Sequence, residues 1–209
     1  MKYALTNGVI LDGSKDMQPQ RGKTVLTDGE IITAIVQDDA DLNGYTVIDL
    51  QNRYLMPGLI NMHVHLAGNG KPQKKQRDNE KLVKRIMSTR LTRTIAYKMV
   101  CGFANDELLG GVTTIRTVGG LGDFDTRLRD EITAGSRVGP RILASNQGIS
   151  VPGGHMAGSV AVAAANIPEA LAQLEKARSE KVDLIKLMIT GGVLDAKEKG
   201  VPGSAIRPI

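Results

Sequence analysis

The chain has 209 residues, of which 41% are hydrophobic and 23% are charged, and its net charge is +5. This composition is typical of a soluble globular protein, and the apolar runs are too short for a membrane-spanning helix. A single cysteine, Cys101, excludes an internal disulfide bond, and Met1–Leu5 lacks the apolar core of a signal peptide, so we expect a cytoplasmic protein without membrane association.

Residues 1–55 favour short strands and turns, and Asp28-Gly29 is typical of a hairpin turn because both positions favour positive φ. From Met56 onward strands alternate with helices, as in parallel βα units. We predict strands in that second part at 59–65, 112–118, 141–144 and 184–189. Helices are predicted over about 80–109, with Gly102 as the candidate point of a break, over 125–134, and from Pro168 onward.

His63 and His65 are two of only three histidines in the chain, and they lie at the end of a short apolar strand. Residues two apart on a strand point to the same face, so both imidazoles can reach one metal ion. Pro57-Gly58 precedes this strand and Gly68-Asn69-Gly70 follows it, which opens the strand end into a loop. The alternative is a pair of core histidines satisfied by hydrogen bonds.

Five motifs in the chain together resemble those of the amidohydrolase superfamily. Pro57-Gly58 with the following His-x-His resembles the first barrel strand, and 182–193 resembles the fourth strand of the branch with imidazolonepropionase-like enzymes and Xaa-Pro or Xaa-Arg dipeptidases. The other three are 111–116, 139–145 and 153–155. The resemblance implies an α/β fold: a partial TIM (β/α)8 barrel of about four βα units over 56–209, preceded by part of a small β-sandwich domain over 1–55.

The same resemblance implies a metal site that this chain supplies in part. It implies that Lys186 is carboxylated and bridges two divalent metals, with His63 and His65 as further ligands. The remaining ligands of the family, two histidines and an aspartate that acts as general base, would lie beyond Ile209. A complete barrel needs roughly 250 residues, so we expect this chain to be the N-terminal half of a longer enzyme. Thr117 departs from the family, because many relatives carry an acidic residue there.

Lys186 also stands out by its position in the apolar run 184–189, which predicts a fully buried strand. Burial disfavours the ammonium form, and a neutral amine can add to carbon dioxide to give an anionic carbamate that two cations would stabilise. The alternative is a lysine whose charged end reaches the surface at the barrel mouth.

Two further residues are candidates for substrate binding. His155, on the glycine-rich loop 147–158, can donate a hydrogen bond to a substrate carboxylate; otherwise it is an exposed loop histidine without a role. Arg116, on the predicted second barrel strand, is either a substrate anchor or a structural ion-pair partner.

The segment 71–93 carries nine lysines and arginines against Asp78 and Glu80. Such a tract could bind phosphate backbones, but it has no interleaved aromatic residues for base stacking. An apolar stripe of helical spacing runs through and beyond it, and we predict that this stripe is buried: Leu82, Ile86, Leu91, Ile95 and Met99. A solvated helix face is therefore favoured over nucleic-acid binding.

The resemblance to amidohydrolases implies a metal-dependent hydrolase of C–N amide bonds that acts on a dipeptide, an N-acyl amino acid or a cyclic amide through metal-activated water. The expected cofactors are up to two divalent metals, zinc in the first place, and the carbamate of Lys186. We expect this chain alone to be inactive. The alternative is a non-catalytic barrel half that self-associates through its open sheet edges, and in either case we expect a homo-oligomer or association with the missing half.

Overall fold

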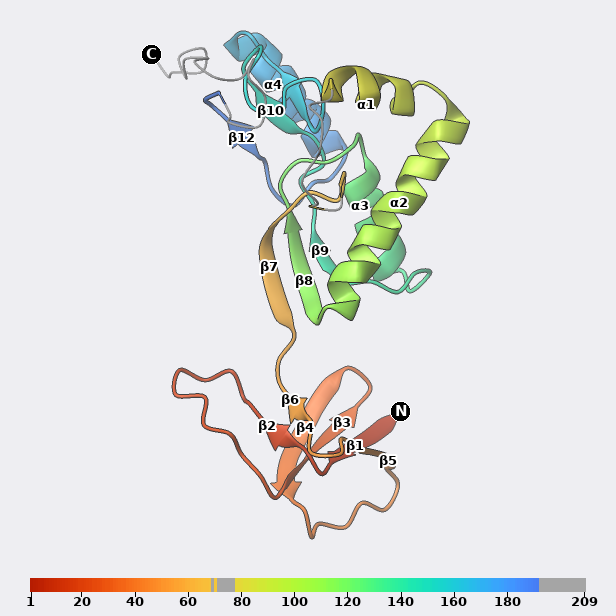
Figure 1. Cartoon of the computed structure of the whole chain (residues 1–209), viewed down its shortest axis with the longest axis vertical. Coiled ribbons are helices and arrows are strands. Elements are labelled where there is room, and N and C mark those ends of the chain that lie inside the picture. The colour runs from red at the N-terminus through yellow and green to blue at the C-terminus, as the bar shows by residue number, and fades with distance from the viewer. Residues whose placement is uncertain (69, 71–77, 192–209) are drawn as a thin grey trace. The chain divides into compact units, whose positions relative to one another are not determined.

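The structure is a computed structural model that describes residues 1–68, 70 and 78–191 (Figure 1). The chain divides into two compact units, Met1–Gly58 and Leu59–Ile209. Along the described part of the chain, no helix combines the length and the apolar character that crossing a bilayer requires.

The first unit is built on a four-stranded sheet in the order β4-β3-β1-β5. Its strands are β1 (Lys2–Thr6), β3 (Lys23–Asp28), β4 (Ile31–Gln37) and β5 (Thr46–Asp49), and β2 (Val9–Ile10) pairs separately with β6 (Tyr54–Leu55). The hairpin between β3 and β4 is confirmed, and Gly29 in its turn has a φ of 59°. Ala4 and Val25 from neighbouring strands lie in the small core of this unit. Its assignment to a β-sandwich stays a prediction.

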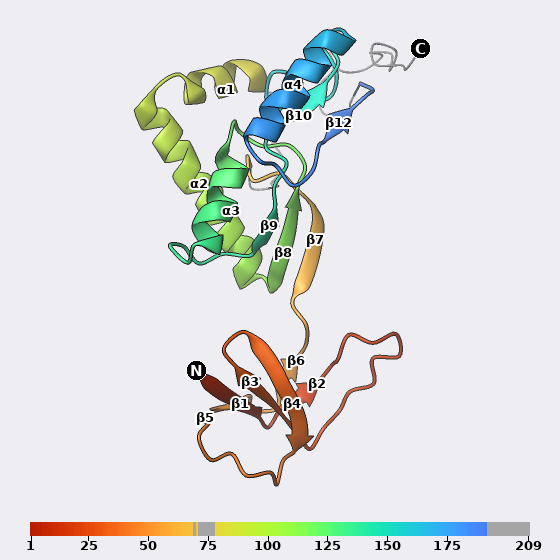
Figure 2. The ribbon, with the colours of Figure 1, turned by 180° about the vertical axis from the view of Figure 1, so that it is seen from behind.

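The second unit begins with a parallel sheet of β7 (Leu59–Val64), β8 (Val112–Thr117) and β9 (Arg141–Leu143). Two helices, α2 (Arg90–Leu109) and α3 (Phe124–Thr133), lie on the same side of this sheet (Figures 1 and 2). The core lies between these layers, where Ile115 of β8 and Leu128 of α3 are fully buried. The elements predicted at 112–118, 125–134 and 141–144 are thus confirmed to within one residue at each end.

A second parallel sheet follows, in the order β11-β10-β12, with strands β10 (Gly148–Ser150), β11 (Ala161–Ala163) and β12 (Leu187–Met188). Helix α4 (Ile167–Ser179) connects β11 to β12, and Asn166 caps it by accepting a hydrogen bond from Glu169 N. The sequence did not predict β10 or β11, because their glycine, serine and alanine residues have low strand propensity. The predicted strand 184–189 is correspondingly reduced to two residues.

The long helix predicted over 80–109 is two helices, α1 (Asn79–Met87) and α2. The break lies at Ser88-Thr89 and the prediction of a break at Gly102 was wrong, since Gly102 lies inside α2. Thr89 has an extended backbone, and its side chain accepts a hydrogen bond of 3.2 Å from Thr92 N. This N-cap satisfies a backbone donor at the start of α2 and so favours a new helix at that point.

The apolar stripe predicted to be buried is largely exposed. Leu91, Ile95 and Met99 are 70%, 51% and 54% exposed, and Leu82 is also exposed, whereas Ile86 packs against the core. The buried residues of α2 are instead Ala96, Tyr97, Val100 and Ala104. Both rows have a four-residue spacing, and the row with small side chains is the one that allows close contact between helix and sheet.

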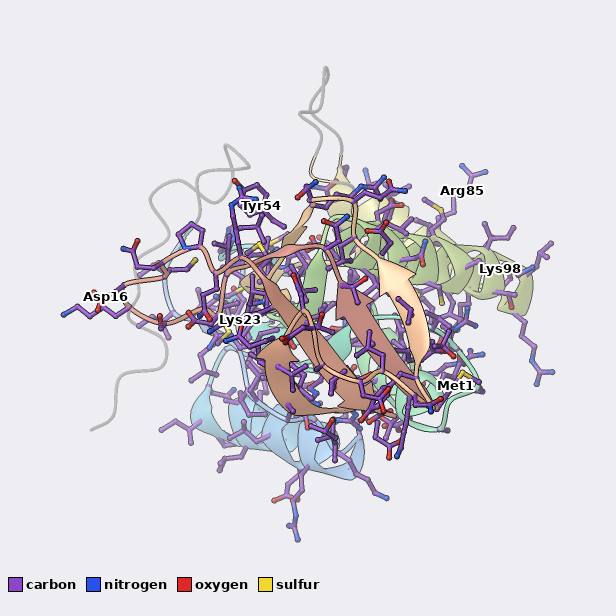
Figure 3. The ribbon with its side chains drawn as sticks, turned by 90° about the horizontal axis from the view of Figure 1, so that it is seen from below. Met1, Asp16, Lys23, Tyr54, Arg85 and Lys98 are labelled. Atoms are coloured by element: carbon purple, nitrogen blue, oxygen red, sulfur yellow. The ribbon has the colours of Figure 1, made fainter. Side chains whose placement is uncertain are left out.

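The basic tract is described from residue 78 onward, and 71–77 lie outside the described residues. Its described lysines and arginines are exposed on α1 and the start of α2, and Lys84 forms an ion pair of 3.0 Å with Glu80. Arg85 of α1, like Lys98 further along α2, extends away from the helices (Figure 3). This part of the tract is the solvated helix face that the sequence predicts.

The burial difference between Leu128 and Leu91 predicts a difference in stability. Leu128→Ala removes a fully buried side chain and should lower the free energy of unfolding by about 2–5 kcal/mol. Leu91→Ala, the matched control at a 70% exposed position, should change it by less than about 0.5 kcal/mol. Urea denaturation followed by circular dichroism measures both values, and an equal loss in the two variants would contradict this packing.

Candidate metal centre

His63 and His65 lie at the C-terminal end of β7, where a bulge shifts the pairing of β7 with β8 between Asn61 and Val64. The Asn61 side chain supports this bulge, because its Oδ1 accepts a hydrogen bond of 3.2 Å from His63 N. Its Nδ2 donates to Glu107 of α2, 3.2 Å from Oε2. The side chain of Asn61 therefore links the backbone at His63 to the helix layer.

The two imidazoles face each other, with 3.3 Å between His63 Nε2 and His65 Nε2. Their ring centroids are 5.2 Å apart and the ring planes meet at 64°. Two nitrogens that bind one tetrahedral zinc ion, each at about 2.0–2.1 Å, lie about 3.3–3.4 Å apart. The observed separation thus fits shared ligation of one divalent metal.

The ring of His65 is oriented by a backbone carbonyl. Its Nδ1 lies 3.0 Å from Gly119 O, so Nδ1 carries the proton and Nε2 keeps the lone pair that a metal requires. Burial lowers the pKa of His65 below its usual value, the Gly119 carbonyl opposes this, and the charges of His63, Lys186 and His155 lower it further. His65 is therefore held neutral near pH 7.

Lys186 and His155 both act on His65 through their charges, which lower its pKa. Lys186 comes directly before β12, and a Cβ atom at Gly148 of β10 would lie 3.3 Å from its Cγ. His155 N donates a hydrogen bond of 3.3 Å to Thr190 O, which ties the glycine-rich loop to the segment after β12. Of the residues that the sequence singles out, the structure thus places His63 and His65 in contact and links His155 to the segment after β12.

The expectation that Lys186 lies in a fully buried strand was wrong. Its neighbours Ile185 and Leu187 are 41% and 52% exposed, and Lys186 itself is half-buried. The physical reason is that β12 is an edge strand of its sheet, so part of its surface stays uncovered.

Arg116 bonds to the backbone of the neighbouring strand. Its Nε donates a hydrogen bond of 2.8 Å to Met62 O, so the guanidinium joins β8 to the backbone of β7 next to the histidine pair. Within residues 1–68, 70 and 78–191 it forms no ion pair. A contact with substrate stays a prediction.

Sequence reasoning missed Asp125, in the first turn of α3, which is 1% exposed. Burial raises its pKa to about 6, although hydrogen bonding by the Thr117 hydroxyl and Asn146 N–H lowers it. Its Oδ2 has no hydrogen-bond partner among the described residues. No sequence signal marked it, because acidic residues are common in the first turn of ordinary solvent-exposed helices.

Asp125 belongs to a group of buried polar residues at the ends of β8 and β9. Thr117, Ser145 and Asn146 are all at most 1% exposed. Ser145 N donates to Thr117 Oγ1 over 3.1 Å, and Gly119 N donates to Ser145 Oγ over 2.9 Å. Thr117, noted as a departure from the family, therefore holds the segment that carries the His65 acceptor.

A cavity of about 760 Å³ adjoins the histidine pair, and its lining includes Phe103, Glu107, Met156 and Val160. Cavities of this size accommodate small molecules.

Comparison with known proteins identifies the family. Residues 54–204 match the model of the Amidohydrolase family, which is well over half of the chain. The chain belongs to the amidohydrolase family.

Solved structures of amidohydrolases support the same fold. A putative prolidase from Bifidobacterium longum is 30% identical with a TM-score of 0.71, over 93% of this chain and 42% of that one. A Xaa-Pro dipeptidase with bound methionine in the active site is 27% identical with a TM-score of 0.70, over 92% and 48%. A dihydroorotase from Bacillus pumilus (strain SAFR-032) is 35% identical over 74 residues, 35% of this chain and 16% of that protein. The chain spans about half the length of the two structures.

The raised pKa of Asp125 predicts a specific pH dependence of stability. Its carboxyl group is protonated in the fold up to about pH 6 and in the unfolded chain only below about 3.8. The contribution of this carboxyl group to the free energy of unfolding is therefore largest at low pH. It falls by up to about 3 kcal/mol as the pH rises from about 4 to about 6. The free energy of unfolding of the wild type relative to Asp125→Asn should fall over this range and stay constant above it.

Urea denaturation at a series of pH values measures this difference. Asp123→Asn is the matched control, because Asp123 precedes the same helix but its side chain is 52% exposed. If the free energy of unfolding of Asp125→Asn varies with pH in parallel with that of the wild type from pH 4 to 7, the raised pKa of Asp125 is wrong.

Proposed function

We propose that this chain forms part of a metal-dependent hydrolase that cleaves C–N amide bonds. Membership of the amidohydrolase family supports hydrolysis. The observation that carries the metal dependence is the 3.3 Å separation of the His63 and His65 Nε2 atoms, which suits two ligands of one zinc ion. The hydrogen bond from His65 to Gly119 supports it further, since it leaves the Nε2 lone pair available.

In this proposal His63 and His65 would hold a divalent metal, and Lys186 as a carbamate would supply a further ligand. The carbamate forms when the neutral Lys186 amine adds to carbon dioxide, with a new N–C bond and release of a proton. When bound, the metals supply Lewis acidity, which lowers the pKa of water to near neutral and polarises the scissile carbonyl. Asn61 and Gly119 keep the two imidazoles in place.

The proposed substrate is a small molecule with an amide bond: a dipeptide, an N-acyl amino acid or a cyclic amide. Similarity to a putative prolidase and a Xaa-Pro dipeptidase favours a dipeptide, and similarity to a dihydroorotase favours a cyclic amide. The charge of His155, which lowers the pKa of His65, supports a role for His155 in binding a substrate carboxylate. Arg116 lies on the same strand pair and is the second candidate for this contact.

The proposed architecture is a partial TIM barrel, preceded by part of a β-sandwich. The parallel strands β7, β8 and β9 and the parallel β10–β12 sheet support this assignment, because barrels are built from parallel strands joined by helices. His63, His65 and Lys186 are fewer ligands than a closed two-metal site needs. We therefore expect the chain alone to bind one metal weakly and not to turn over substrate.

Titration of the metal-free chain with Co²⁺, followed by the visible absorption of the ion, tests the proposed site. The wild type should bind one equivalent, and His63→Ala or His65→Ala should weaken binding at least about tenfold, because each removes a directly bound nitrogen. His155→Ala is the matched control, since it removes the third histidine near the site but no proposed ligand; its affinity should change less than threefold. Equal affinities in all four proteins would refute the site.

Exposed apolar residues on edge strands favour a second behaviour, which is association of the chain with other chains. Ile60 and Met62 on β7 are 62% and 47% exposed, and Leu187 on β12 is 52% exposed. Edge strands with uncovered apolar side chains are sites of association. We propose that the chain self-associates through these edges or pairs with further barrel strands.

Sedimentation velocity over a range of concentrations tests this association. Wild-type chain should show species larger than a monomer, and Ile60→Lys with Leu187→Lys should shift the distribution toward monomer, because a buried lysine disfavours strand pairing. Leu109→Lys, at a 78% exposed position on α2, should leave the distribution unchanged. A wild type that is monomeric throughout would contradict the proposal.

A further inference from the structure

Asp125 lies directly beneath the Gly119-Gly120 turn, whose first carbonyl binds His65. A Cβ atom at Gly120 would lie 2.5 Å from Asp125 Oδ2, so only glycine fits above this carboxyl group. Gly119 has a φ of 130°, and a Cβ atom there would lie 3.3 Å from His65 Nδ1. The turn is therefore confined between the carboxyl group of Asp125 and the ring of His65.

A second route from Asp125 to the same turn runs through Thr117 and Ser145. The Thr117 hydroxyl donates a hydrogen bond of 3.4 Å to Leu143 O, and it is also close enough to the Asp125 carboxyl group to lower the pKa of that group. A hydroxyl that donates in this way can accept from Ser145 N, which lies 3.1 Å away. Ser145 Oγ in turn accepts from Gly119 N over 2.9 Å. These contacts thus reach Gly119, and the carbonyl oxygen of the same residue lies 3.0 Å from His65 Nδ1.

We propose that Asp125 is a positioning residue for His65: through Thr117 and Ser145, and by contact beneath Gly120, it holds the Gly119 carbonyl against His65 Nδ1. Asp125 touches neither metal nor substrate, and it acts on the tautomer and orientation of the ring. The inference rests on the proposed metal site for its functional consequence. The orientation of His65 itself does not depend on a bound metal.

The cost of burying Asp125 supports a specific role. A carboxyl group that is 1% exposed, with one oxygen lacking a partner among the described residues, is unfavourable compared with an apolar or fully bonded side chain. On its own helix, Phe124 and Leu128 are buried apolar residues, whereas the neighbouring Thr117, Ser145 and Asn146 are buried and polar. A group retained at such a cost, in contact with a two-glycine turn, is suited to fixing that turn rather than to filling volume.

The test measures the tautomer of His65 in the metal-free chain, labelled with ¹⁵N in its histidines, by long-range ¹H–¹⁵N correlation at pH 8. Signals are assigned with His63→Gln and His155→Gln. In the wild type His65 should be almost wholly in the Nδ1–H form. Asp125→Ala should give a mixture with the Nε2–H form, and Asp125→Asn, which keeps an acceptor for Thr117, should restore the wild-type spectrum.

Co²⁺ affinity is the second readout. Asp125→Ala should weaken binding about 10-fold or more, as loss of groups that orient metal-binding histidines does, and Asp125→Asn should stay within threefold of the wild type. Asp123→Ala, beside the same turn but exposed, should change neither readout. Should Asp125→Ala not fold, Thr117→Val removes the same connection at similar volume, with Thr117→Ser as its control.

The outcomes separate the inference from the proposed function. If His65 keeps the Nδ1–H form in Asp125→Ala and in Thr117→Val, the positioning role is wrong even when Co²⁺ binds. If the wild type binds no Co²⁺, the proposed function fails, whereas a tautomer change in Asp125→Ala would still support the positioning of His65 by Asp125.

Discussion

The hydrogen bond between His65 Nδ1 and Gly119 O is the contact on which the candidate site depends. It joins the end of β7 to the loop after β8, and it leaves Nε2 facing His63 Nε2 at 3.3 Å. Its geometry requires the parallel pairing of β7 with β8, because that pairing brings residues 54 positions apart into contact. It also requires a glycine at 119, where φ is 130°. The fold thus positions the lone pair of His65 Nε2 through backbone contacts.

The sequence predicted those parts of the fold and site that depend on local pattern. The predicted bounds of strand β8 and of helix α3 are correct to within one residue. The shared face of His63 and His65 follows from the two-residue period of a strand, and the 3.3 Å between their Nε2 atoms bears this out. The motif order indicated the amidohydrolase family, and the family match confirms it.

The features that the sequence did not predict depend on contacts between distant segments. Two apolar rows run along α2 with the same spacing, and only packing against the sheet selects Ala96 and Val100 over Leu91 and Ile95. Strands β10 and β11 form from residues of low strand propensity because they pair with each other and with β12. Asp125 is buried because α3 places it under the Gly119-Gly120 turn, which no local pattern indicates.

The histidine pair and Lys186 differ in what determines their environment. The separation and tautomer of the histidines are set by contacts among Asn61, His65, Gly119 and Ser145. The environment of Lys186 is set by whatever covers β12, an edge strand whose neighbours Ile185 and Leu187 are exposed in this chain. The contacts that orient the histidine pair thus lie within this chain, whereas the strand next to Lys186 has one uncovered edge.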